Sequence, residues 1–371
     1  MKISPFKIEE WMNKYECHAK YDFTTTCIKS FSLKELFELC GHDVAEFCEK
    51  SLDYGDITGS ERLKSACLSL YKGFDFENIT VTHGAIGANE LVFKSLVEPK
   101  DEVVVIIPIY QQLYSVPEQI GANVKFVRLK EDLDWHIDFE ELEKVVTDKT
   151  KLVVLNNPNN PTGAVFSKSE LVKIVEIAKK HGTYILCDEV YRFLEHEKNN
   201  DFVSITELYE KGISTFSMSK TFSLAGIRVG FVVAADKKII AEINHQRQYN
   251  TISISFLDDY TAALALENKK KIITRNLGII ESRKNILLNK ICQIPQLSLI
   301  TPQAGTTAFV KYHSEMNSYD FCLKLFNETG VLLLPGEALE FDKYFRLGYC
   351  IDEKILSDGL DVLASWLKIN C

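Results

Sequence analysis

The segment SMSKTFSLAGIRVG, residues 217–230, places one lysine between small hydroxyl residues and ends with an arginine and two further residues. The amine of Lys220 can attack a carbonyl group to form a Schiff base and, once released, can carry a proton. Ser217, Ser219 and Arg228 are residue types that bind phosphate, because their O–H and N–H groups donate to phosphate oxygens. A solvated lysine fits the motif SKT equally well when it is considered alone.

Two further groups of polar residues follow strand-like apolar runs. Asp188 ends the run in ILCDEVY, where a buried carboxylate could keep a pyridinium nitrogen protonated. Solvated acids at the end of a strand are the plainer interpretation. The sequence NNPNNPTG, residues 156–163, is typical of a turn. Four asparagines beside a core strand nevertheless favour a role for one amide, and Asn160 is the candidate donor to a phenolate oxygen.

The segment THGAIGAN, residues 82–89, links a predicted strand to a predicted helix. Its small residues would let the backbone N–H groups of Ala85 and Ile86 approach an anion at the start of the helix. The segment is neither a P-loop nor a complete G-x-G-x-x-G motif, so it does not predict a nucleotide site. Tyr110, which follows IIPI, either packs in the core or forms an aromatic plate against a planar ring.

The elements that must position these residues alternate between strands and helices. Apolar runs predict strands at 78–84, 101–108, 123–129, 151–158, 183–190, 212–220 and 228–235, and periodic segments predict helices at 88–97 and 167–182. This alternation predicts an α/β domain with a mostly parallel sheet. In such sheets, functional sites gather at the carboxyl ends of the strands, where the candidate residues above other than Arg228 fall.

The 371-residue chain is long enough for a large and a smaller domain. A charged helical stretch begins near residue 268 and leads into a second set of strands and a helix. We therefore predict an N-terminal arm, or part of the small domain, at 1–45, a large domain at 46–268, and a small C-terminal α/β domain at 269–371.

Composition excludes several classes of function. The net charge of -9 argues against nucleic-acid binding, and no apolar run is long enough to predict a membrane span. The charged N-terminus is unlike a secretory signal, and the ten cysteines are scattered without metal-site spacing. We expect reduced cysteines without disulfides, no metal, and a cytoplasmic location.

Taken together, NNPNNPTG, CDEVY and SMSKTFSLAGIR, in this order, resemble the motifs of the class I/II aminotransferases. These are fold-type I enzymes of amino acid metabolism that depend on pyridoxal 5′-phosphate. The resemblance extends from about residue 54 to about residue 346. It implies a large domain with a mostly parallel seven-stranded sheet between helices, and a smaller C-terminal α/β domain.

The resemblance also implies catalytic roles. Lys220 would form the Schiff base with the cofactor and move the proton of the substrate α-carbon. Asp188 would pair with the pyridine nitrogen. Asn160 and Tyr191 would bind the phenolate oxygen, and Tyr110 would stack on the ring.

The remaining roles concern the phosphate, the substrate and a second subunit. The phosphate would be held by Ser217, Ser219, Arg228 and the backbone at Ala85 and Ile86. Arg346, in FRLGY, would clamp the substrate carboxylate beside Asn160. Tyr54, in YGDITG, would reach the phosphate of the neighbouring subunit, which implies a homodimer with shared active sites. Asn250 and Thr251 are weaker candidates for a loop that crosses between the subunits.

Two segments depart from the family pattern. YDFTTTC, residues 21–27, replaces a motif that lies beside the substrate carboxylate, and QQLYSVP follows the stacking tyrosine. Gln111, Gln112 and Tyr114 would point polar groups toward the pocket. With TTTC, HGAIGAN, YQQLY and YNTIS, the chain also resembles a capreomycidine-synthase-like branch, which eliminates and cyclises a hydroxyarginine.

Three functions therefore remain. The first is amino-group transfer between an amino acid and a 2-oxo acid. The second is β-elimination or cyclisation of a substituted amino acid by the same residues. The third is a non-catalytic regulator, but such proteins usually carry an added DNA-binding domain, for which the sequence shows no segment. The preferred prediction is the first, an aminotransferase, and the sequence does not identify its amino donor or its acceptor.

Overall fold

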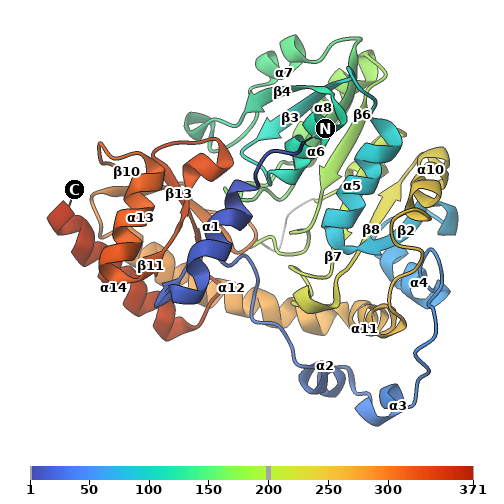
Figure 1. Cartoon of the computed structure of the whole chain (residues 1–371), viewed down its shortest axis with the longest axis horizontal. Helices are drawn as coiled ribbons and strands as arrows, with labels where there is room; N and C mark the ends of the chain where they lie inside the picture. Colours follow the sequence, from blue (N-terminus) through green and yellow to red (C-terminus); the bar gives the residue numbers. More distant parts are fainter. Residues whose placement is uncertain (1, 198–201, 371) are drawn as a thin grey trace.

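The computed structural model describes residues 2–197 and 202–370, and its largest element is a seven-stranded sheet (Figure 1). In spatial order the strands are β2 (Ile79–His83), β8 (Val229–Ala234), β7 (Gly212–Ser217), β6 (Tyr184–Asp188), β5 (Thr150–Asn156), β3 (Glu102–Ile107) and β4 (Asn123–Arg128). Neighbouring strands are parallel except that β8 is antiparallel to both β2 and β7. The predicted α/β fold with a mostly parallel seven-stranded sheet is confirmed.

Helices surround this sheet and continue into the C-terminal part of the chain (Figure 1). They are α1 (Lys7–Tyr15), α2 (Leu33–Cys40), α3 (Val44–Cys48), α4 (Glu61–Leu68), α5 (Gly84–Leu96), α6 (Gln112–Ile120), α7 (Phe139–Val145), α8 (Lys168–Lys180), α9 (Ile205–Leu208), α10 (Lys237–Arg247), α11 (Phe256–Glu267), α12 (Lys269–Ile291), α13 (Ser318–Thr329) and α14 (Glu353–Asn370). The start of α8 is fixed by a reciprocal capping box between Ser167 and Glu170, as its sequence predicts. None of these described helices is both long and apolar enough to cross a lipid bilayer.

The central strands are buried on both faces, which explains their unbroken apolar runs. Successive side chains of a strand point to opposite faces of the sheet. In β3, Val103 and Val105 therefore pack in the same cluster as Leu91 of α5. Val104, between them, packs in the cluster that contains Leu171 of α8. Helices on both faces hold the sheet rigid, so the ends of its strands are fixed in space.

A smaller antiparallel sheet lies in the C-terminal part of the chain. Its strands, in spatial order, are β12 (Leu334–Pro335), β13 (Tyr344–Gly348), β10 (Thr307–Tyr312) and β9 (Leu297–Leu299). The N-terminal segment joins this unit, because β1 (Tyr21–Asp22) pairs in parallel with β11 (Val331–Leu332). Figure 1 shows α12 running from α11 toward this smaller unit. The domain borders at 45/46 and 268/269 stay a prediction.

The sheet brings the candidate residues to one edge. The parallel strands β5, β6 and β7 end there with Asn156, Asp188 and Ser217. Because β8 is antiparallel, it begins at the edge where β7 ends, and Ser217 pairs with Gly230. Arg228 directly precedes β8 and therefore arrives beside the ends of the parallel strands.

Candidate active site

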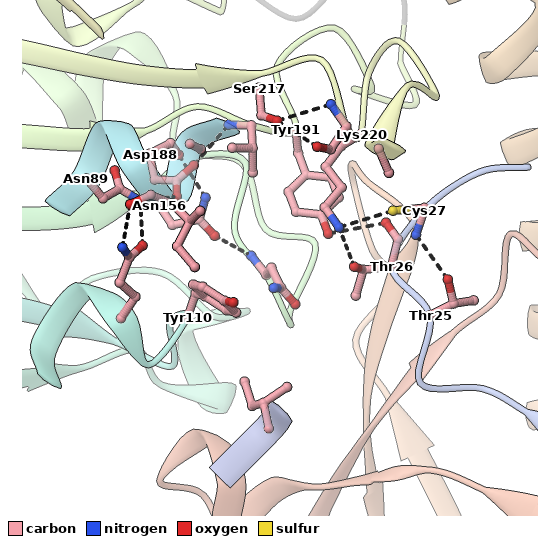
Figure 2. A pocket seen from close by; sticks show the side chains of 18 of the residues that line it. Thr25, Thr26, Cys27, Asn89, Tyr110, Asn156, Asp188, Tyr191, Ser217 and Lys220 are labelled. Atoms are coloured by element: carbon pink, nitrogen blue, oxygen red, sulfur yellow. Dashed lines mark hydrogen bonds between the residues drawn. The ribbon is translucent and has the colours of Figure 1, made fainter. Parts of the chain in front are cut away.

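A pocket of about 320 Å³ lies at this edge and is drawn in Figure 2. It is lined by eleven of the twelve predicted site residues, namely Ala85, Ile86, Tyr110, Asn160, Asp188, Tyr191, Ser217, Ser219, Lys220, Arg228 and Arg346. Tyr54 is the exception: its side chain is 89% exposed, and its backbone pairs with Ser255. The structure of one chain therefore assembles these eleven residues, whereas Tyr54 and the weaker candidates Asn250 and Thr251, which were assigned to contacts between subunits, do not line the pocket.

Lys220 reaches into this pocket from the turn that follows β7. Its Nζ donates to Thr26 Oγ1 at 2.6 Å and to Cys27 Sγ at 3.3 Å. Burial lowers the pKa of the amine, but the neighbouring Tyr191 and Cys27 side chains outweigh this effect and raise the pKa above its usual value. Figure 2 shows Lys220 beside Tyr191, on the side of the pocket formed by the N-terminal segment. Two residues of the YDFTTTC segment thus contact the lysine itself.

Asp188 is buried, 5% exposed, and accepts hydrogen bonds at both carboxylate oxygens. Val190 N donates to Oδ1 at 3.1 Å, and Asn89 Nδ2 donates to Oδ2 at 3.3 Å. Burial raises the pKa of this carboxyl group to about 6. A buried carboxylate of this kind is stabilised by a cation beside it, which is what a protonated pyridine nitrogen supplies.

Asn89 is a site residue that the sequence interpretation missed. It lies in α5, and Thr215 Oγ1 donates to its Oδ1 at 2.7 Å, which fixes the orientation of the amide. Its Nδ2 can then point at Asp188. The signal available in the sequence was a polar residue on the otherwise apolar face of a predicted helix.

Most asparagine side chains of the segment 156–163 form hydrogen bonds that hold the turn. Asn156 accepts from Asn160 N at 2.7 Å and donates to Asp188 O at 2.8 Å. Asn157 bonds the backbone of Phe166, and Asn159 accepts from Thr162 N within the turn and donates to Pro108 O after β3. Only the Asn160 side chain contacts another predicted functional group, since its Oδ1 accepts from Arg346 Nη1 at 3.3 Å. The turn interpretation therefore explains three of the four asparagines.

The start of α5 lies beside Arg228, and the two together suit an anion. No side chain caps this end of the helix, so its first N–H groups have no intrahelical or capping partner. Gly84 has φ of +66°, and a Cβ there would meet Arg228 Nη2 at 2.8 Å. A Cβ on Gly230 would lie 2.3 Å from the Gly84 carbonyl carbon, so only glycine permits this approach of β8 to the helix. Arg228 Nη1 also donates to Ser219 Oγ at 3.4 Å, so these two predicted phosphate ligands lie together.

Arg346, on β13, brings a second cation into the pocket. Its side chain is 2% exposed, and Nη2 donates to Thr24 O at 2.9 Å. Its Nε is buried without a hydrogen-bond partner within the described part of the chain. Burial lowers the pKa of the guanidinium group. A buried cation with an unused donor, facing a pocket, suits an anion such as a carboxylate.

The segment after Tyr110 differs from its prediction. Gln112 does line the pocket, where its Nε2 donates to Ile86 O at 2.5 Å. Gln111 instead bonds the N-terminal segment, accepting from Lys7 N and donating to Pro5 O. Tyr114 donates to Glu340 Oε1 at 2.9 Å, away from the lining residues. The prediction that all three face the pocket is therefore wrong for Gln111 and Tyr114, because chain segments distant in sequence offer them other partners.

The arrangement fits pyridoxal 5′-phosphate. An uncapped helix start with Arg228 suits a phosphate, the buried Asp188 suits a pyridinium nitrogen, and Lys220 lies in the same pocket. Tyr191 and Asn160 line the pocket between these groups and Arg346. The chemical groups needed at each end of the cofactor are thus all present.

Comparison with known proteins agrees with this geometry. Residues 32–363 match the family described as "Aminotransferase class I and II". A solved pyridoxal-phosphate-dependent aminotransferase from Streptococcus suis is 42% identical, with a TM-score of 0.95 over 99% of this chain and 98% of that one.

Two further relatives are named for two different activities. An aspartate aminotransferase of Sulfolobus acidocaldarius is 29% identical over 88% of this chain and 86% of its own length. Capreomycidine synthase of Streptomyces vinaceus is 27% identical over 97% of this chain and 93% of its own length. On the family match and the fold, the chain belongs to the class I and II aminotransferases, the transaminases whose cofactor is pyridoxal 5′-phosphate.

Proposed function

We propose that this pocket transfers the amino group of an amino acid to a 2-oxo acid. The observation that carries the proposal is that one pocket holds a reactive amine, a buried carboxylate and a buried arginine with an unused donor. These are Lys220, Asp188 and Arg346, and each suits a different part of the reacting complex.

The proposed cofactor ligands divide into two groups. Asp188, held by Asn89, would pair with the ring nitrogen, while Asn160 and Tyr191 would donate to the ring oxygen and Tyr110 would stack on the ring. The phosphate would lie at the start of α5, bound by the backbone of Ala85 and Ile86 and by Ser217, Ser219 and Arg228. When bound, pyridoxal 5′-phosphate supplies an electron sink that stabilises negative charge at the substrate α-carbon.

Lys220 is the proposed proton carrier. Once its amine is free of the cofactor, Nζ can take the proton from the substrate α-carbon and return a proton at the end of the half-reaction. Thr26 Oγ1 and Cys27 Sγ lie within hydrogen-bond reach of Nζ and can hold the protonated amine in place. Burial excludes bulk water from this step, which limits loss of the proton to solvent.

The substrate carboxylate is assigned to Arg346, and this assignment predicts the behaviour of Arg346→Lys. The variant keeps a positive charge but loses the planar pair of donors that binds both carboxylate oxygens. We expect the KM for the amino donor to rise about 10- to 100-fold. Steady-state kinetics at saturating 2-oxo acid measures this change. An unaltered KM would show that the carboxylate binds elsewhere.

Elimination or cyclisation is the second candidate. It is favoured by similarity to capreomycidine synthase over nearly the whole chain, and by Thr26 and Cys27 at the catalytic lysine. Both reactions begin with removal of the same proton, so the residues named above serve either outcome. The two reactions differ in their products.

A half-reaction experiment separates these functions. Purified protein loaded with cofactor is mixed with an amino acid in the absence of a 2-oxo acid, and absorbance and products are followed together. Amino-group transfer predicts a stoichiometric amount of 2-oxo acid and loss of the visible band, which added 2-oxo acid restores. Continuous release of ammonia with no acceptor present would exclude transfer and support elimination, and continuous formation of a cyclised donor without ammonia would support cyclisation.

We also propose a homodimer with shared active sites. Large side chains of two neighbouring segments are strongly exposed in the single chain, including Leu52, Tyr54 and Tyr249. Apolar exposure of this extent is typical of an interface. In Figure 1, α2 and α3 extend away from the two sheets, as an arm that contacts a second subunit would.

The dimer predicts a specific effect for Tyr54→Phe. If its hydroxyl donates to the phosphate in the partner subunit, the variant should lose cofactor affinity about tenfold, the effect of one hydrogen bond to a charged group. Tyr319→Phe, a change at an exposed tyrosine of α13 in the smaller unit, should leave affinity unaltered. Equilibrium titration measures the affinity for the cofactor, and sedimentation analysis measures the oligomeric state. A monomeric protein with full cofactor affinity would contradict the proposal.

A cytoplasmic location is proposed because the nine cysteines in the described part of the chain are free, as is usual in a reducing compartment. Fractionation of the producing cells tests this, and recovery of the protein outside the cytoplasm would overturn it.

A further inference from the structure

Glu9 is a charged residue of the pocket that the proposed reaction leaves unused. Five charged side chains line the pocket: Glu9, Asp188, Lys220, Arg228 and Arg346. The last four are assigned to the cofactor, the proton and the substrate carboxylate. Glu9 comes from α1, and its Oε1 accepts a hydrogen bond from the Tyr110 hydroxyl at 3.0 Å. Its carboxylate therefore lies at the edge of the proposed aromatic plate.

The carboxylate of Glu9 forms no ion pair within the described residues, and its charge acts on the Arg346 guanidinium only from beyond ion-pair distance. Its neighbour Lys7 pairs with Glu340 at 2.6 Å, and Arg346 bonds Asn160 and Thr24. The Glu9 side chain is half-buried, so solvent screens its charge only in part. A half-buried carboxylate facing a pocket favours a ligand with a positive charge.

The surroundings of Glu9 also suit a long aliphatic stem. Ile8 and Met12, on the same helix, line the pocket beside it, and Ile8 is 2% exposed. Apolar side chains next to a carboxylate match a side chain of several methylene groups that ends in a cation. A short acidic side chain would bring a second negative charge toward Glu9.

Helix α1 is fixed firmly enough for Glu9 to select a substrate. Gln111 binds both Lys7 N and Pro5 O at 2.8 Å, and Trp11 Nε1 donates to Leu333 O at 2.9 Å. The helix is thus tied to the large sheet through Gln111 and to the smaller unit through Trp11. This gives the otherwise unexplained Gln111 a positioning role, since a preorganised charge discriminates better than a mobile one.

We propose that Glu9 is a specificity-determining residue, which selects amino donors whose long side chain ends in a guanidinium or ammonium group. The inference rests on the proposed function in one respect only: it takes the substrate α-carboxylate to be bound by Arg346. It predicts discrimination against aspartate and glutamate as donors, in contrast to the names of several relatives.

Binding of unreactive ligands tests the proposal independently of the reaction. 5-Guanidinopentanoate lacks an amino group on its α-carbon and cannot enter the reaction, and 5-ureidopentanoate is its neutral counterpart. Calorimetry on the cofactor-loaded protein should give about tenfold tighter binding of the guanidino compound. In Glu9→Gln this preference should fall to about onefold, while Gln can still accept the Tyr110 hydrogen bond. Glu10→Gln removes an exposed charge from the same helix and should keep the preference.

The same comparison with reactive donors separates this inference from the proposed function. Arginine should exceed citrulline about tenfold in kcat/KM in the natural protein and in Glu10→Gln, but not in Glu9→Gln. Equal binding of the two unreactive ligands, or an equal loss for both in Glu9→Gln, would overturn the role of Glu9. Turnover of neutral or acidic donors with no preference for arginine would overturn it as well, while leaving amino-group transfer intact. If ammonia is released instead of the amino group being transferred, the proposed function fails, and the binding preference still decides the role of Glu9.

Discussion

The Lys220→Ala variant is expected to lose its covalent link to the cofactor, and its kcat should fall by more than about 10⁴-fold. The substitution removes both the nucleophile and the proton carrier, and acid–base catalysis alone contributes up to about that factor. Asp188 and the start of α5 remain, so the variant should still bind the cofactor non-covalently. Its visible spectrum should then be that of free pyridoxal 5′-phosphate.

Mass spectrometry of the intact chain and a turnover assay check this expectation. Reduction with borohydride followed by mass spectrometry of the intact chain should add the cofactor mass to the natural protein and not to Lys220→Ala. Lys179→Ala, a change at an exposed lysine of α8, serves as the control and should behave like the natural protein. Cofactor attached to another lysine, or substantial turnover by Lys220→Ala, would disprove the assignment.

Asp188→Asn should lower kcat at least about 100-fold, the usual effect of removing one preorganised electrostatic contact. Asparagine keeps the shape, and its single amide oxygen can accept from either Val190 N or Asn89 Nδ2, but it has no charge to hold a proton on the pyridine nitrogen. Because the cofactor can still be attached at Lys220, the visible band should persist while turnover falls. A variant with unaltered kcat would show that Asp188 does not govern the ring.

The same substitution should stabilise the cofactor-free protein at high pH. Burial raises the pKa of Asp188 from 3.8 to about 6, so the folded chain binds more protons than the unfolded chain between these values. The stability contribution of the carboxyl group is therefore favourable at low pH and is lost as pH rises through this window. Two pKa units correspond to about 3 kcal/mol, which Asp188→Asn should recover at pH 8 and not at pH 4.

Denaturant unfolding at both pH values measures this difference. With the cofactor bound, the natural protein should be more stable than Asp188→Asn, since the natural carboxylate then faces a cation. A natural protein that is more stable than Asp188→Asn without cofactor at pH 8 would contradict the assigned cause. The predicted penalty illustrates how a functional charge lowers the stability of the fold that carries it.

The sequence was sufficient to predict the sheet and the edge where the site lies. Continuous apolar runs identify strands buried on both faces, and their carboxyl ends meet at one edge. The position of Arg228 was predictable by resemblance but not by pattern, because only the antiparallel direction of β8 brings it to that edge. Apolar periodicity does not encode strand direction.

The residues that were missed depend on contacts distant in sequence. Glu9 enters the pocket on a helix that is about 100 residues from Tyr110, and its neighbours Pro5 and Lys7 are held by Gln111. Asn89 faces Asp188 across the interior. No local pattern indicates the contact of Glu9, and the polar position of Asn89 on an apolar helix face does not identify Asp188 as its partner. For the asparagines of NNPNNPTG the plainer interpretation holds, since hydrogen bonds within and just after the turn involve Asn156, Asn157 and Asn159.

Amino-group transfer is tested most directly by following an isotope. The cofactor-loaded protein is incubated with an α-¹⁵N-labelled amino acid and an unlabelled 2-oxo acid of different carbon skeleton, and the nitrogen products are identified by mass spectrometry. The account predicts that ¹⁵N appears in the amino acid made from the added 2-oxo acid, with an equal amount of 2-oxo acid formed from the donor. Recovery of the label as free ammonia, or within a cyclised donor, would contradict it.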